Sequence, residues 1–548
     1  MSDLLRMTGM YSGMDTESIV SQLVKAKSTK VTNLKNEQKK LEWKQTAWQG
    51  LNSKIYNMYS KTLSNLRLTS AYSKKSTVSS DSTKATVVAS EGAVNGTQTL
   101  KVNKLAKSGY LTGAKLDGKT STTTGTDGKD VTKVVNWETT DKLSEIDSNL
   151  TGKTISITTG SGTDAKTTDI EITADMTIND LVAKFKDAGV NASFDTTNQR
   201  FFINSTGTGS AKNFTLTSDD STALASLGLD PNTTYTDING SKNSCVKIEG
   251  QDAEIVLNGA TFTSDSNTFS INGLTINTLG VTDEEISIVT STDYDGIYNT
   301  IKDFLTEYND LINEMDKLYN ADSARKYDML TDDQKESMTD DEVEQWEDKI
   351  KSALLRKDNS LYNVMNTLTS TMMEGYYENN LSDKEKKNMT SSEIAAWYKE
   401  NGGKKHYLSD YGIGTLSYFE AQDNEHHAYH INGDADDEFT STKEDKLKAA
   451  IAEDPEGTAN FFATLCKTLY SKLDETMSES TEYSSIYKVY NDKQLKKDYK
   501  DYTTKISDAE DELNDYEDRW YNKFSKMEVA LSKLQSQTSS ISSMLGSN

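Results

Sequence analysis

The stretch "LKKDYKDYTTKISDAEDELNDYEDRWYNKFSKMEVALSKLQSQTSSISSML", residues 495–545, carries the strongest periodic pattern in the chain. Apolar side chains recur along it every three or four residues, which is the spacing of one face of an α-helix. Two successive steps of four, at 516, 520 and 524, form a stutter that locally unwinds a supercoil. Fourteen of the fifteen seam positions are apolar: Leu495, Tyr499, Tyr502, Ile506, Ala509, Leu513, Tyr516, Trp520, Phe524, Met527, Leu531, Leu534, Thr538, Ile541 and Leu545, of which only Thr538 is polar.

The N-terminal part of the chain repeats this design. Residues 16–68 predict a second long helix, and Asp15 or Thr16 is a suitable N-cap for it. Its seam recurs every seven residues at Leu34, Leu41, Trp48 and Ile55, with Leu51 and Met58 at the second seam position. An ordinary helical bundle would give similar spacing, but the narrow seams at both chain ends favour a coiled-coil-like assembly role.

The middle of the chain has strand-like composition. Residues 83–105 alternate between apolar and polar side chains, and Asn95-Gly96 within them is a hairpin signal. From 106 to 280 short alternating runs lie among Thr, Gly, Ser and Asp, interrupted by one short helix capped at Asp175 or Thr177. Helical spacing returns after 290. The expected fold is a multidomain α+β protein, with long coiled-coil-like terminal helices forming a stalk and β-rich head domains inserted between them.

These patterns predict three structural parts. Residues 1–35 and 515–548 are expected to be terminal assembly helices, poorly ordered alone. Residues 36–105 and 281–514 would form the helical stalk domain with the hairpin and an insertion near 320–440. Residues 106–280 would form the β-rich head, as two subdomains. The insertion contains a duplication: "LTDDQKESMTDDEVEQW" (330–346) matches "LSDKEKKNMTSSEIAAW" (381–397), and each copy reads as two short helices joined by a turn capped at Thr339 or Thr390.

Composition excludes several classes of protein. The 548-residue chain has a formal net charge of −25, which argues against binding to duplex nucleic acid or anionic lipid. No stretch is apolar enough to insert in a membrane, and no secretory signal pattern begins the chain. The two cysteines, Cys245 and Cys466, lie far apart, so no disulfide framework or CxxC metal site is expected.

No constellation of catalytic residues is visible. The chain has no GxSxG, HExxH or phosphate-loop motif. His426, His427 and His430 lie in "EHHAYH", where a helix would place 426 and 430 on one face, but the segment is strand-like and offers no fourth metal ligand. The acidic run at 434–445 lacks the glycine of a calcium loop. We therefore expect no enzyme, no cofactor and no metal.

Both chain ends are nearly free of charge. Residues 7–24 carry only Asp15 and Glu17, and residues 532–548 carry only Lys533. A helix exposed to water normally has a charged outer face, so these ends are suited to contact with protein on more than one side. The predicted assembly and oligomer interface comprises Leu23, Leu34, Leu41, Trp48, Leu51, Leu513, Tyr516, Phe524, Met527, Leu531, Leu534, Ile541 and Leu545.

Taken in order, six segments of the chain resemble the family of flagellar filament cap proteins, the hook-associated protein 2 (FliD) family. The similarity runs along nearly the whole chain. Its segments are "GMYSGMDTESIVSQLVKAK" (9–27), "SSDSTKATVVASEGAVNGTQTLKVNKLAKS" (79–108), "MTINDLVAKFKDAGVNASFDTTNQRFFINSTGTG" (176–209), "GQDAEIVLNGATFTSDSNTFSINGLTI" (250–276), "YNTIKDFLTEYNDLINEM" (298–315) and "YNKFSKMEVALSKLQSQTSSISSML" (521–545).

The resemblance implies a non-enzymatic cap at the distal tip of the bacterial flagellum, which promotes folding and insertion of exported flagellin. The implied partners are further copies in a homo-oligomeric ring, flagellin, hook–filament junction proteins and a cytoplasmic export chaperone. Secretion would use the flagellar type III route, which places the protein outside the cell at the flagellum tip. The repeat region, 320–440, is longer than in short members of the family.

Two other function classes remain open from the sequence. A secreted adhesin would bind host mucin or other glycans through residues 106–280, although Trp137 is the only tryptophan there. An extracellular hydrolase would need a catalytic pair that the sequence does not display. A glycan array with the head and a turnover assay would separate these classes from the assembly protein.

Overall fold

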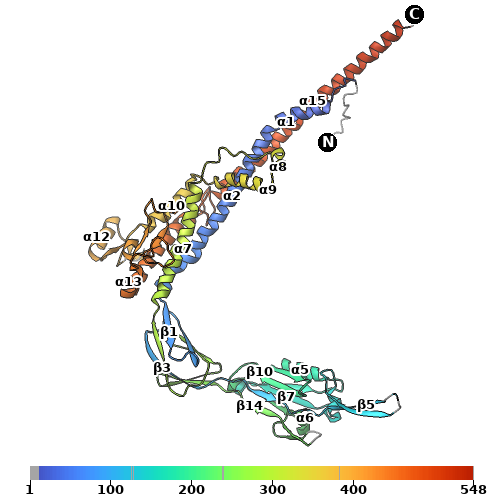
Figure 1. Cartoon of the computed structure of the whole chain (residues 1–548), viewed down its shortest axis with the longest axis vertical. Helices are drawn as coiled ribbons and strands as arrows, with labels where there is room; N and C mark the ends of the chain where they lie inside the picture. The colour runs from blue at the N-terminus through green and yellow to red at the C-terminus, as the bar shows by residue number, and fades with distance from the viewer. Residues whose placement is uncertain are drawn as a thin grey trace. The chain divides into compact units, whose positions relative to one another are not determined.

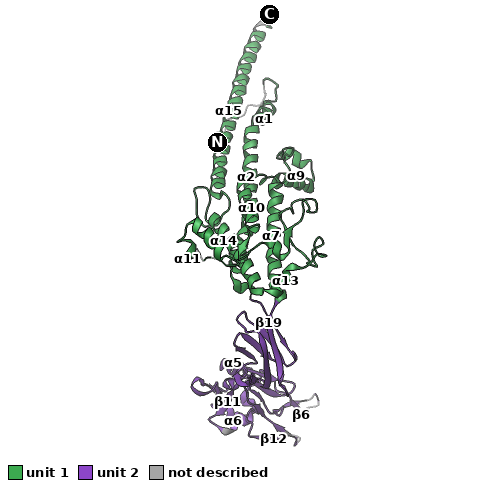
Figure 2. Ribbon diagram, turned by 90° about the vertical axis from the view of Figure 1, so that its left-hand side faces the viewer, with its two compact units in different colours: residues 1–72, 294–548 green, residues 73–293 purple. Residues whose placement is uncertain are grey.

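The computed structural model describes residues 11–546 except 125, 127, 128, 237–239, 380 and 382. The side chains of Ser221, Lys242, Asp383, Met544 and Leu545 also lie outside the described residues. The chain divides into two compact units, coloured in Figure 2. Unit 1 comprises residues 1–72 and 294–548, and unit 2 comprises Ser73–Asp293, so that unit 2 is an insertion in unit 1. Residues 73–105 and 281–293, expected in the stalk domain, lie in unit 2 because their strands pair within its sheets.

Unit 1 is mainly helical (Figure 1). Its helices and helical turns are α1 (Thr16–Lys27), α2 (Thr29–Asn57), the π-turn η1 (Met58–Leu63), α3 (Ser64–Leu66), η2 (Thr69–Tyr72), α7 (Tyr294–Tyr319), α8 (Asp332–Glu336), α9 (Asp340–Ser352), α10 (Asn359–Met372), α11 (Asp383–Lys386), α12 (Ser391–Asn401), η6 (Leu408–Tyr411), α13 (Lys446–Glu453), α14 (Pro455–Met477) and α15 (Asp492–Leu545). Two small antiparallel ladders join β20 (Tyr376–Tyr377) to β21 (Lys405–His406) and β22 (Ile413–Thr415) to β23 (Tyr429–Ile431).

One apolar core holds unit 1 together. It lies among the second half of α2, the length of α7, and the helices α10 and α14. The side chains at its centre are Trp48, Ile55, Met58, Phe304, Tyr308, Leu368, Phe462 and Leu469. On α7 the buried side chains recur at helical spacing from Ile297 to Met315, which is the single face that the sequence predicts after residue 290.

The long N-terminal helix is confirmed with two local changes. It is interrupted at Ser28, where the hydroxyls of Ser28 and Thr29 donate to the carbonyls of Lys25 and Ala26 and so compete with the helical ladder. Residues 58–63 then widen into a π-turn before the helix ends. Helices α13 and α14 are separated at Asp454. Pro455 has no N–H to donate within a continuing helix, but it fits the first turn of α14.

Unit 2 contains two separate apolar cores, each between sheets. The first core lies between the sheet with strand order β1-β19-β3-β15-β16 and the sheet with strand order β17-β18-β2. The second lies among the sheets β14-β4-β10-β9 and β11-β7-β8, covered by α5 (Ile178–Asp187). The strands are β1 (Lys75–Ser79), β2 (Ala85–Ala89), β3 (Gly96–Lys104), β4 (Tyr110–Thr112), β7 (Thr154–Thr159), β8 (Lys166–Glu171), β9 (Val190–Asp195), β10 (Arg200–Ser205), β11 (Phe214–Ser218), β14 (Val246–Ile248), β15 (Ala253–Leu257), β16 (Ala260–Ser264), β17 (Thr268–Ile271), β18 (Leu274–Thr278) and β19 (Ile286–Thr292).

Smaller elements complete unit 2. Two further antiparallel ladders pair β5 with β6 and β12 with β13. These elements are β5 (Lys119–Thr124), β6 (Asp130–Val135), β12 (Thr234–Thr236), β13 (Lys242–Ser244), α4 (Leu143–Ile146), η3 (Ser148–Leu150), η4 (Gly162–Asp164), η5 (Ser210–Lys212) and α6 (Ser221–Ser226).

The hairpin predicted at Asn95-Gly96 is wrong. The strands on either side of this turn, β2 and β3, belong to different sheets. Strand β3 pairs instead with β19 and β15, and β2 pairs with β18, and every paired residue lies at least 150 positions further along the chain. A turn signal identifies where the chain reverses but carries no information about which distant strand supplies the hydrogen bonds.

The predicted helix caps are confirmed. Thr177 closes a capping box with Asp180 at the start of α5, whereas the alternative cap, Asp175, forms an ion pair with Lys142. In the duplicated segments, Thr339 and Thr390 each form a capping box with the glutamate three residues later. The two copies therefore share the same local hydrogen bonds as well as the same sequence pattern.

Candidate assembly surface

Helices α1 and α2 run antiparallel to α15. We treat α1 and α2 as one arm and α15 as the other, and we call the two arms together the terminal pair. Figure 1 shows α2 and α15 side by side along unit 1. Lys30 Nζ lies 2.8 Å from Glu512 Oε2, Gln38 Nε2 donates to Thr503 Oγ1 at 2.8 Å, and Trp48 stacks on Tyr490. Residue numbers rise along α2 while they fall along α15, so the two predicted seams face each other within one chain.

The side chains at one end of the terminal pair are buried in the core of unit 1, and we call this the inner end. The rings of Trp48 and Tyr490 are parallel within 6° at a centroid distance of 5.0 Å. The Asn52 amide donates to the carbonyl of Tyr487 at 3.2 Å and accepts from the N–H of Val489 at 3.0 Å. Trp48 and Leu51 are only 1% and 2% exposed, so both belong to the core of unit 1 rather than to a free surface.

The outer part of the terminal pair is a two-helix seam. Leu23, Leu34 and Leu41 on one side are half-buried, and so are Leu513, Tyr516, Phe524 and Met527 on the other. Two helices alone cannot enclose a seam, because each apolar side chain keeps one flank open to water. The pair is joined at its surface by exposed ion pairs, in which Lys30 lowers the pKa of Glu512 and Lys35 lies 2.6 Å from Glu510.

Glu528 joins the N-terminal segment to α15. Its carboxylate accepts from the backbone N–H groups of Tyr11 at 2.9 Å and Ser12 at 3.3 Å, and from the Ser12 hydroxyl. These bonds lower the pKa of Glu528, with the Ser12 hydroxyl as the largest cause, and the residue is fully covered at 0% exposed. Asp15 then caps α1 by accepting from the N–H of Ser18. Tyr11 and Ser12 thus connect the start of the described chain to Glu528 on α15.

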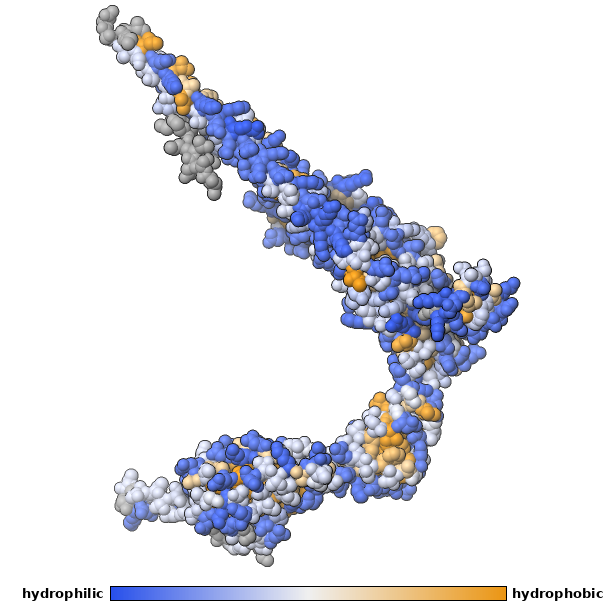
Figure 3. All heavy atoms as spheres, turned by 180° about the vertical axis from the view of Figure 1, so that it is seen from behind, coloured by the Kyte–Doolittle hydropathy of each residue, from blue (hydrophilic) through white to orange (hydrophobic). Residues whose placement is uncertain are grey.

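Beyond Glu528, α15 continues without a partner helix among the described residues, and we call residues 529–545 the overhang. At 1.5 Å per residue the overhang is about 25 Å long. Leu534 and Ile541 are 58% and 57% exposed on it, and Leu531 is half-buried. Lys533 is its only charged residue. Figure 3 shows apolar residues at the surface near this end of the molecule. The side chain of Leu545, also predicted at the interface, lies outside the described residues.

The other sequence candidates are scattered. His430 on β23 hydrogen-bonds Asp437 at 2.6 Å, whereas the ring of His426 stacks on Tyr418. In the acidic run, Lys302 Nζ lies 2.7 Å from Asp434. In the described part of the chain, no group of three or more His, Cys, Asp or Glu side chains is arranged to hold a metal ion.

The residue that sequence reasoning missed is Glu528. It is the only acidic residue between 519 and 548, and a lone carboxylate in an otherwise acid-free segment is the signal that could have identified it. Its partners are the Ser12 hydroxyl and two backbone N–H groups more than 500 residues away, which no local side-chain pattern displays. Separately, none of the described helices combines the length and the apolar character that crossing a membrane requires.

Fold and surface together define a multidomain α+β protein whose paired terminal helices present apolar side chains that the described chain does not cover. A family model for the flagellar hook-associated protein 2 C-terminus matches residues 250–536, and one for the N-terminus of the same family matches residues 12–109. The chain belongs to the flagellar hook-associated protein 2 family.

Individual relatives share this description at low sequence identity. The flagellar hook-associated protein 2 of Halalkalibacterium halodurans is 24% identical over 586 aligned positions, which span 98% of this chain and 99% of that protein. That of Thermotoga maritima is 26% identical over 382 positions, spanning 69% of this chain and 53% of that protein. The crystal structure of the flagellar cap protein FliD D1-D2-D3 domains from Escherichia coli is 19% identical, with a TM-score of 0.46, and covers 78% of this chain and 96% of that one.

Proposed function

We propose that this protein is a filament-capping structural protein at the distal tip of the bacterial flagellum, where it promotes folding and insertion of exported flagellin. Membership of the flagellar hook-associated protein 2 family supports this proposal. The observation that carries it furthest is the overhang, a nearly uncharged helix end on which Leu534 and Ile541 are exposed to water. A cap must hold a growing polymer through such a surface, because its neighbours change each time a subunit is added.

The mechanism that we propose uses the gradient of stability along the terminal pair. At the inner end, Trp48 and Tyr490 stack in a buried core, and such a pair contributes about 0.5–1.5 kcal/mol beyond the area that it buries. At the outer end the ion pairs of Lys30 and Lys35 are exposed, and water and salt screen such pairs so that they add little to stability. The outer helices can therefore separate and rebind while the base of unit 1 stays folded.

Further copies of the chain in a ring, and flagellin beneath them, are the partners that we propose for the half-buried seam. A third or fourth helix packed on Leu34, Leu513 or Phe524 would close the open flank that two helices leave. The same logic applies to the overhang, which a cytoplasmic export chaperone would cover before secretion through the flagellar type III route. The site of action would be outside the cell, at the flagellum tip.

The test is the double variant Leu531→Glu/Leu534→Glu, expressed in a bacterium that lacks its own copy of the gene. We expect short or absent filaments and unpolymerised flagellin in the medium, because the two charges would face protein in the cap. The variant Ser536→Glu/Ser543→Glu adds the same charge to the far side of the same helix, about 120–180° around it from Leu531 and Leu534, and should leave filaments normal. Normal filaments from the first variant would contradict the proposal.

The adhesin alternative, in which residues 106–280 bind mucin or other glycans, stays a prediction. Trp137 is buried in the second core of unit 2, and its indole Nε1 donates to the carbonyl of Asp117 at 2.6 Å. Its ring is therefore closed to a sugar, and no other tryptophan lies in this range. Binding of the whole protein to a glycan array would support the alternative.

A further inference from the structure

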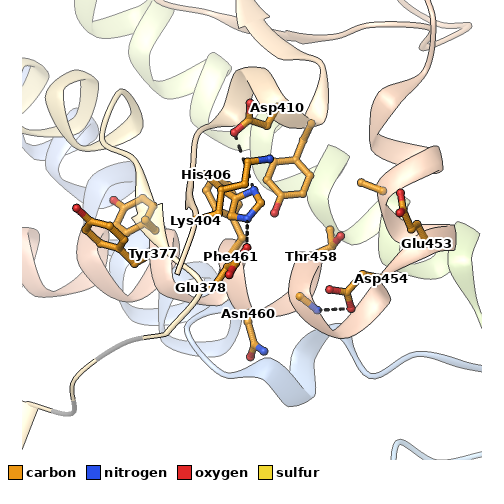
Figure 4. Close-up of a pocket in the computed structure, with 14 residues that line it drawn as sticks. Tyr377, Glu378, Lys404, His406, Asp410, Glu453, Asp454, Thr458, Asn460 and Phe461 are labelled. Atoms are coloured by element: carbon orange, nitrogen blue, oxygen red, sulfur yellow. Dashed lines mark hydrogen bonds and ion pairs between the residues drawn. The ribbon is translucent and has the colours of Figure 1, made fainter. Parts of the chain in front are cut away.

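Unit 1 contains a cleft that lies apart from the terminal pair and plays no part in the proposed function. It has a volume of about 590 Å³ and opens between the ladder of β20 and β21, the turn η6 and the junction of α13 with α14. Figure 4 shows His406, Glu378 and Lys404 on one wall and Glu453, Asp454 and Thr458 on the other.

Two hydroxyl groups in this cleft have no hydrogen-bond partner in the described part of the chain. They belong to Tyr411, which is 93% buried, and to Thr458, which is 98% buried, and both residues line the cavity. Neither hydroxyl oxygen is among the fully enclosed polar atoms that lack a partner, so solvent reaches both. Native proteins satisfy such groups with water or with a ligand. The two hydroxyls thus offer hydrogen-bonding groups to a polar ligand in the cleft.

The charged side chains that line the cleft indicate whether the ligand is positively or negatively charged. Four carboxylates line it, those of Glu378, Asp410, Glu453 and Asp454, against the single ammonium of Lys404. Burial raises the pKa of Tyr411, and the charges of Asp410, Asp454 and Glu378 raise it further, so negative charges converge on this hydroxyl. The field in the cleft therefore favours a cation.

The existing hydrogen bonds leave acceptor atoms available. Glu378 Oε1 is engaged by His406 Nε2 at 3.0 Å, and Asp454 Oδ1 accepts from the N–H of Gly457 as the cap of α14. Glu453 makes no hydrogen bond or ion pair among the described residues, and Asp454 Oδ2 has no hydrogen-bond donor there either. Phe461 packs under Tyr411 with a centroid distance of 4.6 Å and supplies an aromatic surface.

We propose that this cleft binds an organic cation, namely an ammonium or guanidinium group carried on an alkyl arm. The carboxylates of Glu453 and Asp454 would accept charge-assisted hydrogen bonds, and the hydroxyls of Tyr411 and Thr458 would complete the set of polar contacts. The aromatic rings would pack against the alkyl arm and face the positive charge. A lysine or arginine side chain of a peptide and a free polyamine share this chemistry.

Binding to the full-length chain can be measured by isothermal titration calorimetry in 150 mM salt, where attraction between distant surface charges is screened. The probes are N-acetyl-arginine amide, N-acetyl-lysine amide and spermidine, with N-acetyl-citrulline amide as the neutral match for arginine. We expect at least one cation to bind at least tenfold more tightly than the citrulline amide. Tighter binding of an amino-acid amide would indicate a peptide source, and tighter binding of spermidine a polyamine. Equal binding of the citrulline amide, or no binding of any cation, would overturn the proposal.

Variants locate the binding site. Glu453→Gln should weaken binding about fivefold, because one charge-assisted contact is lost. Tyr411→Phe keeps the ring and should weaken binding about threefold through loss of the hydroxyl alone. Glu456→Gln is the matched control, because this exposed carboxylate lies on the same segment but does not line the cleft. Equal losses at 453 and 456 would refute a specific site. Filament capping tests the other proposal separately, since none of these residues lies in the terminal pair.

Discussion

Replacing Leu534 and Ile541 with glutamate tests whether the overhang is buried in an assembly. Full burial of a Leu or Ile side chain is worth about 1.5–3 kcal/mol. Because Leu534 and Ile541 are still 58% and 57% exposed in the single chain, burying each against a neighbouring chain would supply about 1–1.5 kcal/mol more. The double variant should lose about 2–3 kcal/mol of association free energy per subunit, which weakens association about 30- to 150-fold.

Sedimentation velocity over a range of protein concentrations measures this loss directly. The thermal unfolding midpoint should not change, because substitutions at exposed positions usually alter stability by less than about 0.5 kcal/mol. Ser536→Glu/Ser543→Glu is the matched control, since each position lies two residues further along and is turned by about 160° around the helix. Unchanged association of the Leu534→Glu/Ile541→Glu variant, or an equal loss in the control, would refute the reasoning. A lowered unfolding midpoint would mean that these side chains already pack within the chain.

Three further predictions concern single residues. Trp48→Ala should lower the free energy of unfolding of unit 1 by about 3–5 kcal/mol in urea titrations, because it leaves a cavity beside Tyr490. Glu528→Gln should increase amide hydrogen exchange at residues 11–15. In the parent protein the pKa of Glu528 is lowered, so the contact should hold above the ordinary glutamate pKa and weaken as pH falls through the lowered value. Burial raises the pKa of Cys466 to about 12, so iodoacetamide at pH 8 should label it only after unfolding, which mass spectrometry would detect.

The sequence predicts the helices of this protein better than its sheets. Apolar spacing between 495 and 545 requires only local information, and the structure forms one helix, α15, across the whole range. The capping boxes at Thr177, Thr339 and Thr390 are local in the same sense. The hairpin at Asn95-Gly96 failed because β3 takes both of its partners from distant parts of the chain. Short alternating strands do not specify such partners.

The spacing of apolar residues in the sequence also could not show which seam residues belong to the core and which remain at the surface. Trp48 and Leu513 occupy equivalent places in the pattern, yet Trp48 is enclosed by unit 1 and Leu513 is half-buried. The difference depends on α7, α10 and α14, which pack only around the inner half of the terminal pair. Likewise, Glu528 acquires its role from the Ser12 hydroxyl and from backbone N–H groups, all more than 500 residues away in sequence. Three-dimensional packing decides both cases.

Cryo-electron microscopy of filament ends from bacteria producing this protein tests the central claim most directly. The account predicts a ring of copies of this chain at the distal tip, with residues 529–545 of each copy enclosed by neighbouring subunits or by flagellin. Filament ends that lack the protein, or copies at the tip whose Leu534 and Ile541 remain open to solvent, would contradict it.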